Sequence, residues 1–174
     1  MLDKLIDLII SLWNRVNPFI IVYEYEWVVL LRAGKVKKVL NTELHFRLLK
    51  LICLEDIHLC SKKPDTYKLS GINITTTDNK TALIGAVVEY VIKDPIKWLI
   101  ENSTAEGNFH DIAWGTCGEL LTTVEWDELK QKSTRTKTKN KLAAECEHLG
   151  VEIMSVSFGD IVLNRVYSLF KDGY

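Results

Sequence analysis

The stretch YKLSGINITTTDNKTALIGAVVEYVI, residues 67 to 92, decides the fold. Its first part, Tyr67–Thr77, and its last part, Thr81–Ile92, are rich in β-branched residues, and the polar residues Asp78-Asn79-Lys80 separate them. Short polar residues between two β-branched runs predict two antiparallel strands joined by a tight turn. We therefore expect a β-hairpin at the centre of the chain.

The chain before this hairpin also has the character of β-strands. Residues 19–40 are rich in β-branched and aromatic residues and break at Ala33-Gly34, which predicts another hairpin. The run Leu44–Cys60 is apolar with single charges, and the sequence SKKPD that follows is typical of a strand end. The first half of the chain is therefore predicted to be mainly antiparallel β.

The second half changes to helical spacing. Asp94-Pro95 predicts a helix start, because aspartate can accept hydrogen bonds from the first amides and proline fits the first helical position. Gly150 is placed to end a helix that runs to Leu149, and Val151–Ile161 is predicted to be a last strand. The predicted class is α+β: an antiparallel β half, a helical half and a final strand.

The first eighteen residues, MLDKLIDLIISLWNRVNP, predict an amphipathic helix that ends at Asn17-Pro18. Spanning a bilayer takes about 20 mainly apolar residues, and charged residues interrupt this segment too often. A broad apolar arc that includes a tryptophan favours a position in the lipid interface. Packing on its own domain or on a neighbouring subunit is the alternative. The expected membrane contacts are Leu2, Leu5, Ile6, Ile9, Leu12, Trp13, Val16, Phe19 and Ile20.

Composition and motifs give no sign of catalysis. The 174 residues suit one domain, and a net charge of -1 gives no overall attraction to nucleic acid. Four cysteines (Cys53, Cys60, Cys117, Cys146) and four histidines (His45, His58, His110, His148) show no zinc spacing or nucleophile motif, and no phosphate-binding glycine loop occurs. We therefore expect a protein that is not an enzyme, with no metal and no cofactor, and cysteines that are buried thiols in a reducing compartment.

Charge is divided sharply within the helical half. Residues 101–129 contain acids and no Lys or Arg, whereas residues 130–141 contain bases, no acid and no apolar residue. A helix that is polar all round is expected to bridge two bodies or to be solvated. We expect the acidic flank of one copy to face the basic flank of the next; a solvated face is the alternative. The expected interface residues are Glu119, Glu125, Asp127, Glu128, Lys130, Arg135, Lys137, Lys139 and Lys141.

Several short motifs occur in an order that resembles one family. They are EWVVLLRAGKV (26–36), LHF (44–46), TTTDNK (75–80), VVEYVIKDP (87–95), EWDEL (125–129) and GVEIMSVSFGDI (150–161). In this order the chain is similar to the SPFH domain (stomatin, prohibitin, flotillin, HflK/C), also called band 7. The expected domains are a membrane-interface helix over residues 1–18 and an SPFH domain over residues 19–174.

The resemblance implies a membrane-associated scaffold without catalytic activity, on the cytoplasmic face of a membrane, that assembles side by side into a ring or cage. The implied partners are further copies of the chain, the lipid bilayer and a membrane-protein client such as a protease or channel. Family members usually continue into a long coiled coil, whereas this sequence stops at Tyr174, so no tall cage is expected. The alternatives are a soluble ring or shell component, as in the vault particle, with the first helix between subunits, and an adaptor that regulates a membrane protease.

Overall fold

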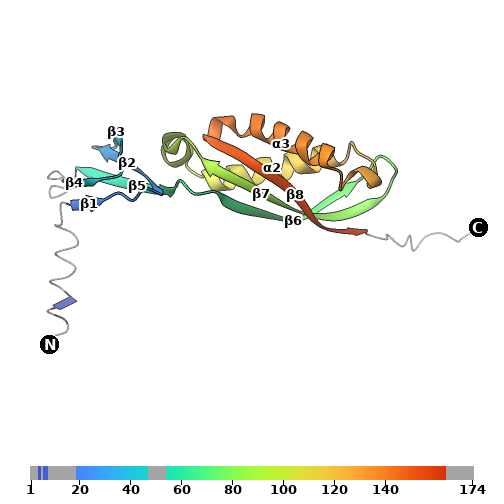
Figure 1. Cartoon of the computed structure of the whole chain (residues 1–174), viewed down its shortest axis with the longest axis horizontal. Helices are drawn as coiled ribbons and strands as arrows, with labels where there is room; N and C mark the ends of the chain where they lie inside the picture. The colour runs from blue at the N-terminus through green and yellow to red at the C-terminus, as the bar shows by residue number, and fades with distance from the viewer. Residues whose placement is uncertain (1–3, 5, 8–18, 47–53, 164–174) are drawn as a thin grey trace, which may run out of the picture.

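The computed structural model describes residues 4, 6, 7, 19–46 and 54–163. Figure 1 shows that they form an elongated molecule, with a small β unit at one end and a larger α/β body at the other. The chain passes from the small unit to the body where strand β5 (Glu55–Ser61) leads to strand β6 (Asp65–Thr75). The predicted α+β class, with antiparallel strands first, helices next and a strand last, is confirmed.

A three-stranded antiparallel sheet in the order β6-β7-β8 forms the centre of the body. Strand β7 (Thr81–Ile92) pairs with β6 on one side and with β8 (Val151–Leu163) on the other. The predicted central hairpin is confirmed, although β6 ends at Thr75 because Thr76 belongs to the turn. The Thr76 hydroxyl donates to Asp78 Oδ1 over 2.5 Å, and Asn79 adopts the left-handed φ of 58° that asparagine tolerates in tight turns.

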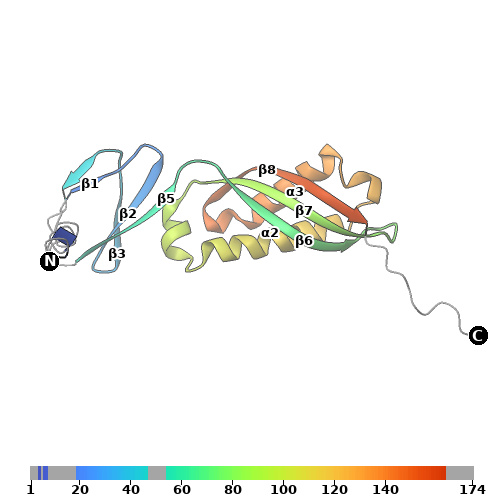
Figure 2. The same ribbon diagram turned by 90° about the horizontal axis from the view of Figure 1, so that it is seen from below.

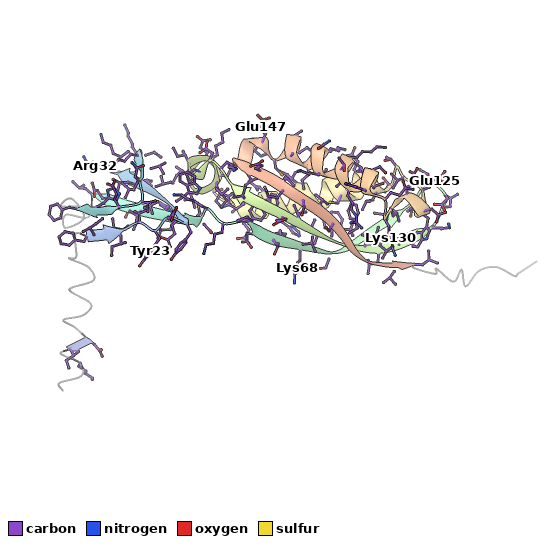
Figure 3. The ribbon with its side chains drawn as sticks, viewed as in Figure 1. Tyr23, Arg32, Lys68, Glu125, Lys130 and Glu147 are labelled. Carbon is purple, nitrogen blue, oxygen red and sulfur yellow. The ribbon has the colours of Figure 1, made fainter. Side chains whose placement is uncertain are left out.

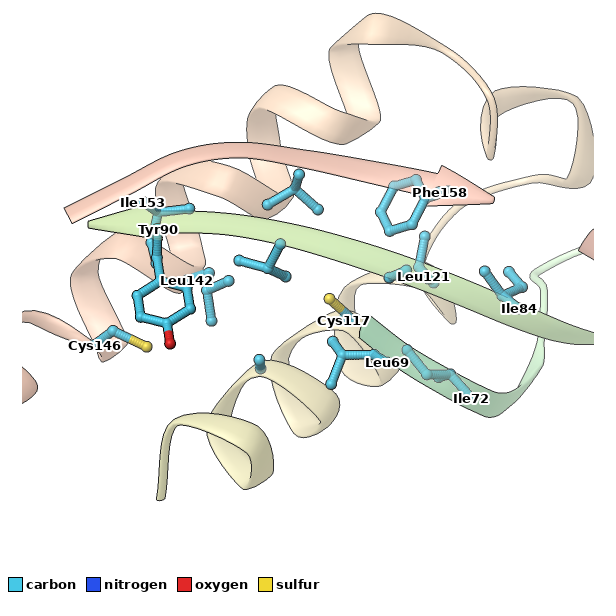
Figure 4. Packing of buried hydrophobic residues seen from close by; sticks show 14 of the residues in the cluster. Leu69, Ile72, Ile84, Tyr90, Cys117, Leu121, Leu142, Cys146, Ile153 and Phe158 are labelled. Atoms are coloured by element: carbon cyan, nitrogen blue, oxygen red, sulfur yellow. The ribbon is translucent and has the colours of Figure 1, made fainter. Parts of the chain in front are cut away.

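Two helices cover one face of this sheet (Figure 2). Helix α2 (Ala105–Leu121) packs over β6, helix α3 (Lys132–Glu145) packs over β8, and the two helices contact each other. Buried side chains from both layers fill the space between them, as Figure 4 shows for Leu69, Ile72, Ile84, Tyr90, Cys117, Leu121, Leu142, Cys146, Ile153 and Phe158. Burial of this single sheet face is therefore the main source of the body's stability.

Helix α3 is packed against the sheet although its first ten residues are all polar. Thr134 and Thr138 are buried, and each hydroxyl donates to a backbone carbonyl, of Glu128 over 2.8 Å and of Thr134 over 2.9 Å respectively. Once the hydroxyl is satisfied in this way, the threonine methyl group can face the core at little cost. The expectation that this helix is solvated on every side is therefore wrong, whereas a bridging role of its outer face stays a prediction.

A tight contact joins the start of the helical half to the start of β8. Asp94 Oδ1 accepts hydrogen bonds from the backbone N–H groups of Ile96 (3.0 Å) and Lys97 (3.3 Å), as the sequence predicts. The helix it begins is only the π-helical turn η2 (Lys97–Glu101), and α2 starts afresh at Ala105. The Gly150 carbonyl accepts from the N–H groups of Lys93 and Asp94, both over 2.9 Å.

Gly150 ends the preceding turn as predicted. The 3-10 turn η4 (Glu147–Leu149) follows α3, and Gly150 then adopts a left-handed φ of 73°. A Cβ at this position would lie 2.8 Å from both Cβ and the carbonyl oxygen of Asp94. Glycine is therefore required here for its backbone conformation and for the close approach of the two segments.

The small unit consists of two short sheets. Strands β2 (Glu26–Arg32) and β3 (Lys35–Leu40) form the predicted hairpin, and β5 pairs on the other side of β2. Strand β1 (Phe19–Ile21) does not extend this hairpin but pairs with β4 (Leu44–Phe46). The run predicted as one strand from Leu44 to Cys60 is thus two strands, and residues 47–53 lie outside the described ranges.

The small unit has its own core and two polar ties. The apolar cluster at its centre consists of Val22, Val28, Leu30 and Leu40. The Trp27 indole N–H donates to the carbonyl of Ile92 over 3.1 Å and so connects the unit to the body. Within the small unit, Arg32 at the end of β2 lies opposite Glu55 at the start of β5. Arg32 Nη2 lies 2.8 Å from Oε1 of the buried Glu55, which gives that carboxylate a charged partner.

Replacing Gly150 with alanine is expected to lower the free energy of unfolding by about 2 kcal/mol or more, because alanine is strained at this φ and its Cβ meets Asp94. Urea denaturation followed by tryptophan fluorescence measures the change. The matched control is Gly107→Ala, where the nearest atom to the new Cβ is Thr104 Cβ at 3.8 Å. If both variants are as stable as the unsubstituted protein, the close approach described for Gly150 does not exist.

Candidate functional site

An exposed apolar patch lies on the two-stranded sheet of the small unit. Phe19 pairs with Phe46 and Ile21 pairs with Leu44, so that all four side chains share one face of the sheet. They are 52 to 62% exposed, and the rings of Phe19 and Phe46 lie 5.3 Å apart. We call these four residues the apolar tip. Large apolar side chains gathered on a surface in this way are typical of an interaction site.

Strand alternation places Ile20 on the opposite face. Its side chain is half-buried against the small core of Val22, Val28, Leu30 and Leu40. Of the two strand residues expected at the membrane, Phe19 is therefore on the apolar tip and Ile20 is not. The expected membrane contacts do not include Ile21, Leu44 or Phe46. The alternation of two short apolar runs was the available signal, but the pairing of β1 with β4 was not visible in the sequence.

The other expected membrane contacts belong to the amphipathic segment. Ile6 is described and exposed, whereas Leu2, Leu5, Ile9, Leu12, Trp13 and Val16 lie outside the described residues. None of the described helices is long and apolar enough to cross a bilayer. In Figure 1 the strands of the apolar tip lie at one end of the molecule, and the end of β8 lies at the other.

Exposed aromatic side chains lie between the apolar tip and the body (Figure 3). The rings of Tyr23 and Tyr25 are stacked with their centroids 5.4 Å apart. The ammonium group of Lys63 lies 4.2 Å from the centroid of the Tyr25 ring, and that of Lys62 lies 4.5 Å from the Trp27 ring. Tyrosine, tryptophan and lysine side chains combine an apolar part with a polar end, which suits the zone between lipid and water.

A basic groove runs between α3 and β8 in the body. It is a hollow of about 470 Å³ lined by Lys130, Lys132, Arg135, Thr136, Lys139, Met154, Ser155 and Val156. Three of the expected interface residues, Lys130, Arg135 and Lys139, therefore lie together here. Lys132 and Met154 join them without having been singled out. Arg135 Nε is buried and has no hydrogen-bond partner in the described part of the chain.

Other expected interface residues already have partners within the chain. Lys141 Nζ lies 2.6 Å from Glu119 Oε2, which ties α3 to α2. The hydroxyl of Thr116 on α2 donates to the carboxylate of Glu145 on α3, a second polar tie between these helices. Lys137 is exposed. One acid and one base of the expected interface thus also serve the fold of a single copy.

The remaining expected acids lie at the end of the body farthest from the apolar tip, where Figure 3 labels Glu125. Glu125, Asp127 and Glu128 are exposed in and beside the 3-10 turn η3 (Trp126–Glu128), next to the β6–β7 turn. Hydrogen bonds from Lys80 and Thr76 lower the pKa of Asp78 in that turn to about 2. The hydrogen bond to Asp78 in turn raises the pKa of Lys80, and the charges of Asp78, Asp127 and Glu125 add to this effect.

Two cysteines, Cys117 and Cys146, are buried in the core of the body. Burial raises the pKa of the Cys117 and Cys146 thiols to about 12, so both are poor nucleophiles near neutral pH. Among the described residues no group of three or more His, Cys, Asp or Glu side chains could hold a metal ion. Burial of Cys117 and Cys146 agrees with the sequence expectation, whereas Cys60 is only half-buried and Cys53 lies outside the described residues. The absence of enzymatic activity stays a prediction.

The order of strands, helices and final strand described above agrees with a comparison against known families. The model of the SPFH domain / Band 7 family matches residues 20–168. The chain belongs to the SPFH domain family. An uncharacterized protein of Archaeoglobus fulgidus is 26% identical over 145 residues, which cover 82% of this chain and 57% of that relative. This SPFH chain therefore spans little more than half the length of that relative.

Charged substitutions at neighbouring positions of β1 test how this SPFH domain presents its apolar tip. Ile20→Asp is expected to lower the free energy of unfolding by about 2 kcal/mol or more, because a carboxylate would enter the small core. Ile21→Asp is expected to change it by less than about 0.5 kcal/mol, since Ile21 is exposed. Urea denaturation of the two variants measures both changes in the free energy of unfolding. Equal changes would contradict the assignment of Ile20 to the buried face and Ile21 to the exposed face of β1.

Proposed function

We propose that this SPFH-domain protein is a membrane-associated scaffold. Its amphipathic segment and its apolar tip attach each copy to the cytoplasmic face of a membrane. The copies assemble side by side into a ring or cage that encloses a patch of bilayer or a membrane-protein client. The proposal assigns no catalytic step and no cofactor to the chain.

The apolar tip is the observation that carries the proposal. Four large, exposed side chains on one face of a two-stranded sheet lie at one end of an elongated molecule, where they can reach a bilayer while the body stays in water. Strand β1, which carries half of this patch, follows directly on the amphipathic segment in the sequence. Burying half of four such side chains is worth about 3 to 6 kcal/mol before ordering costs, so one copy binds weakly and many copies bind firmly.

Charge distribution supports lateral assembly. The basic groove lies along β8, at one edge of the sheet, and α2, which packs over β6 at the opposite edge, carries the exposed acids Glu106 and Asp111. Contacts between two different edges of the body repeat from copy to copy and close into a ring when the rotation allows. Such packing keeps every apolar tip at the same end of the assembly, as attachment to one membrane requires.

Flotation with vesicles of phosphatidylcholine and phosphatidylglycerol tests the attachment. Replacing the cross-strand pair Phe19 and Phe46 with serine in the full chain is expected to reduce the vesicle-bound fraction about tenfold. The matched control replaces another exposed cross-strand pair, Leu83 and Val162, at the far end of the body and should float like the unsubstituted protein. Equal flotation of all three proteins would favour the soluble ring or shell instead.

Charge reversal on α3 tests the assembly. Lys137→Glu combined with Lys139→Glu is expected to reduce the number of copies per particle, measured by mass photometry, because two bases facing an acidic neighbour become acids. Lys141 is left unchanged, since it pairs with Glu119 inside the chain. The control reverses Lys35 and Lys37, two exposed bases of β3 in the small unit. Unchanged particle mass in the α3 variant would count against the basic flank as an interface.

A further inference from the structure

Both outer edges of the body sheet are available for contacts. Among the described strands, β6 and β8 each pair with β7 alone, so that each has one edge without a strand partner. The β8 edge carries the basic groove, and α2 lies over the β6 edge (Figure 2). Natural proteins rarely leave such edges bare, because they attract other chains.

We propose that Trp114 of one copy inserts into the basic groove of the next copy. This inference rests on the proposed lateral assembly and names the contact that builds it. The occupant of the groove is thus a second copy of this chain, presenting the outward face of α2.

Trp114 is an unusual residue to leave in solvent. Its side chain is 43% exposed, on a helix whose buried residues, such as Phe109 and Ala113, lie on another face. Asp111, one turn earlier, is also exposed, and a Cβ added at the neighbouring Gly115 would point into open space. Because its neighbour Gly115 has no side chain and Asp111 is acidic, the Trp114 ring can enter a basic hollow without obstruction from this helix face. Tryptophan is also enriched among the residues that contribute most to binding energy at interfaces.

The groove offers the partners that an indole ring and a carboxylate need. Arg135 lines it with a guanidinium whose Nε lacks a hydrogen-bond partner in the described residues, and such a group binds well to the face of an aromatic ring. Met154 is exposed on β8 and supplies a polarisable apolar wall. Lys130 and Lys139 at the same hollow can face Asp111 of the entering helix.

The two surfaces lie at about the same level of the body. Val156 of the groove is opposite Val88 in the sheet, and Val88 is opposite Tyr67 on β6. The Tyr67 ring contacts Phe109 and His110, one helical turn before Trp114. A sideways displacement across the sheet edges therefore brings the α2 face of one copy to the groove of the next without a large shift along the long axis.

Cysteine cross-linking in the full, vesicle-bound chain tests this contact. A chain with both Trp114→Cys and Met154→Cys is expected to form a ladder of covalent multimers under mild oxidation. A mixture of the two single variants should give dimers, and each single variant alone should give no more product than the unsubstituted chain. Equal cross-linking in the Met154→Cys variant alone would indicate a symmetric contact and overturn the proposal.

Removal of the indole ring gives a second measurement. Trp114→Ala is expected to raise the concentration of half-assembly about 30-fold, with little change in melting temperature because the residue is 43% exposed and is not part of the buried cluster of the body. The control is Leu83→Ala, a side chain equally exposed (43%) on β7. If Trp114→Ala assembles normally while Lys139→Glu does not, another occupant fills the groove and the proposal fails.

The outcomes for this contact and for the proposed function are distinct. If multi-copy particles form on vesicles but the Trp114→Cys and Met154→Cys cross-link never appears, the proposed contact is wrong and the proposed scaffold function is unaffected. If the unsubstituted chain floats with vesicles only as single copies, the proposed assembly is wrong, and so is the proposed contact.

Discussion

Burial of one face of the three-stranded β6-β7-β8 sheet beneath two helices is the constraint on which the rest of the structure depends. The long central hairpin supplies most of that face, and α2 and α3 close it from the same side. Because the hairpin is long and the sheet is narrow, the body is elongated, and the small unit extends it further. Among the described strands, the same arrangement leaves β6 and β8 each with one edge that has no strand partner, and these edges are where we place the contacts between copies.

Helix α3 shows how one segment can meet two opposite demands. It must pack on β8, and it must also present a row of positive charges. Threonine at the inward positions resolves this, because each hydroxyl is satisfied by a backbone carbonyl and the methyl group is left for the core. An aliphatic inner face would bury more apolar area. The threonine face makes α3 polar throughout its first ten residues and still lets it dock.

In the small unit, successive side chains along the three-residue strands β1 and β4 point to opposite faces, so that the core residue and the residues of the apolar tip are different. Ile20 contributes to the core, while Phe19 and Ile21 on either side of it face solvent. Strands β1 and β4, which carry the apolar tip, lie in the small unit, whereas α3 and β8, which line the basic groove, lie in the body (Figure 1). The proposed attachment and the proposed lateral assembly therefore use different residues. This separation suits the scaffold that we propose for this member of the SPFH domain family.

The sequence by itself determined the class of the fold, the central hairpin, the hydrogen-bonded start at Asp94, the stop at Gly150 and the family. These features depend on local signals: strand periodicity, turn residues, capping side chains and short ordered motifs. Only the tertiary structure decided that β1 pairs with β4, that Ile21 rather than Ile20 faces outward, and that Glu119 and Lys141 are partners within one chain. It also brought Met154 to the basic residues of α3. Each of these depends on which segments meet in space, and a pairing between residues distant in the chain leaves no periodic trace in either segment alone.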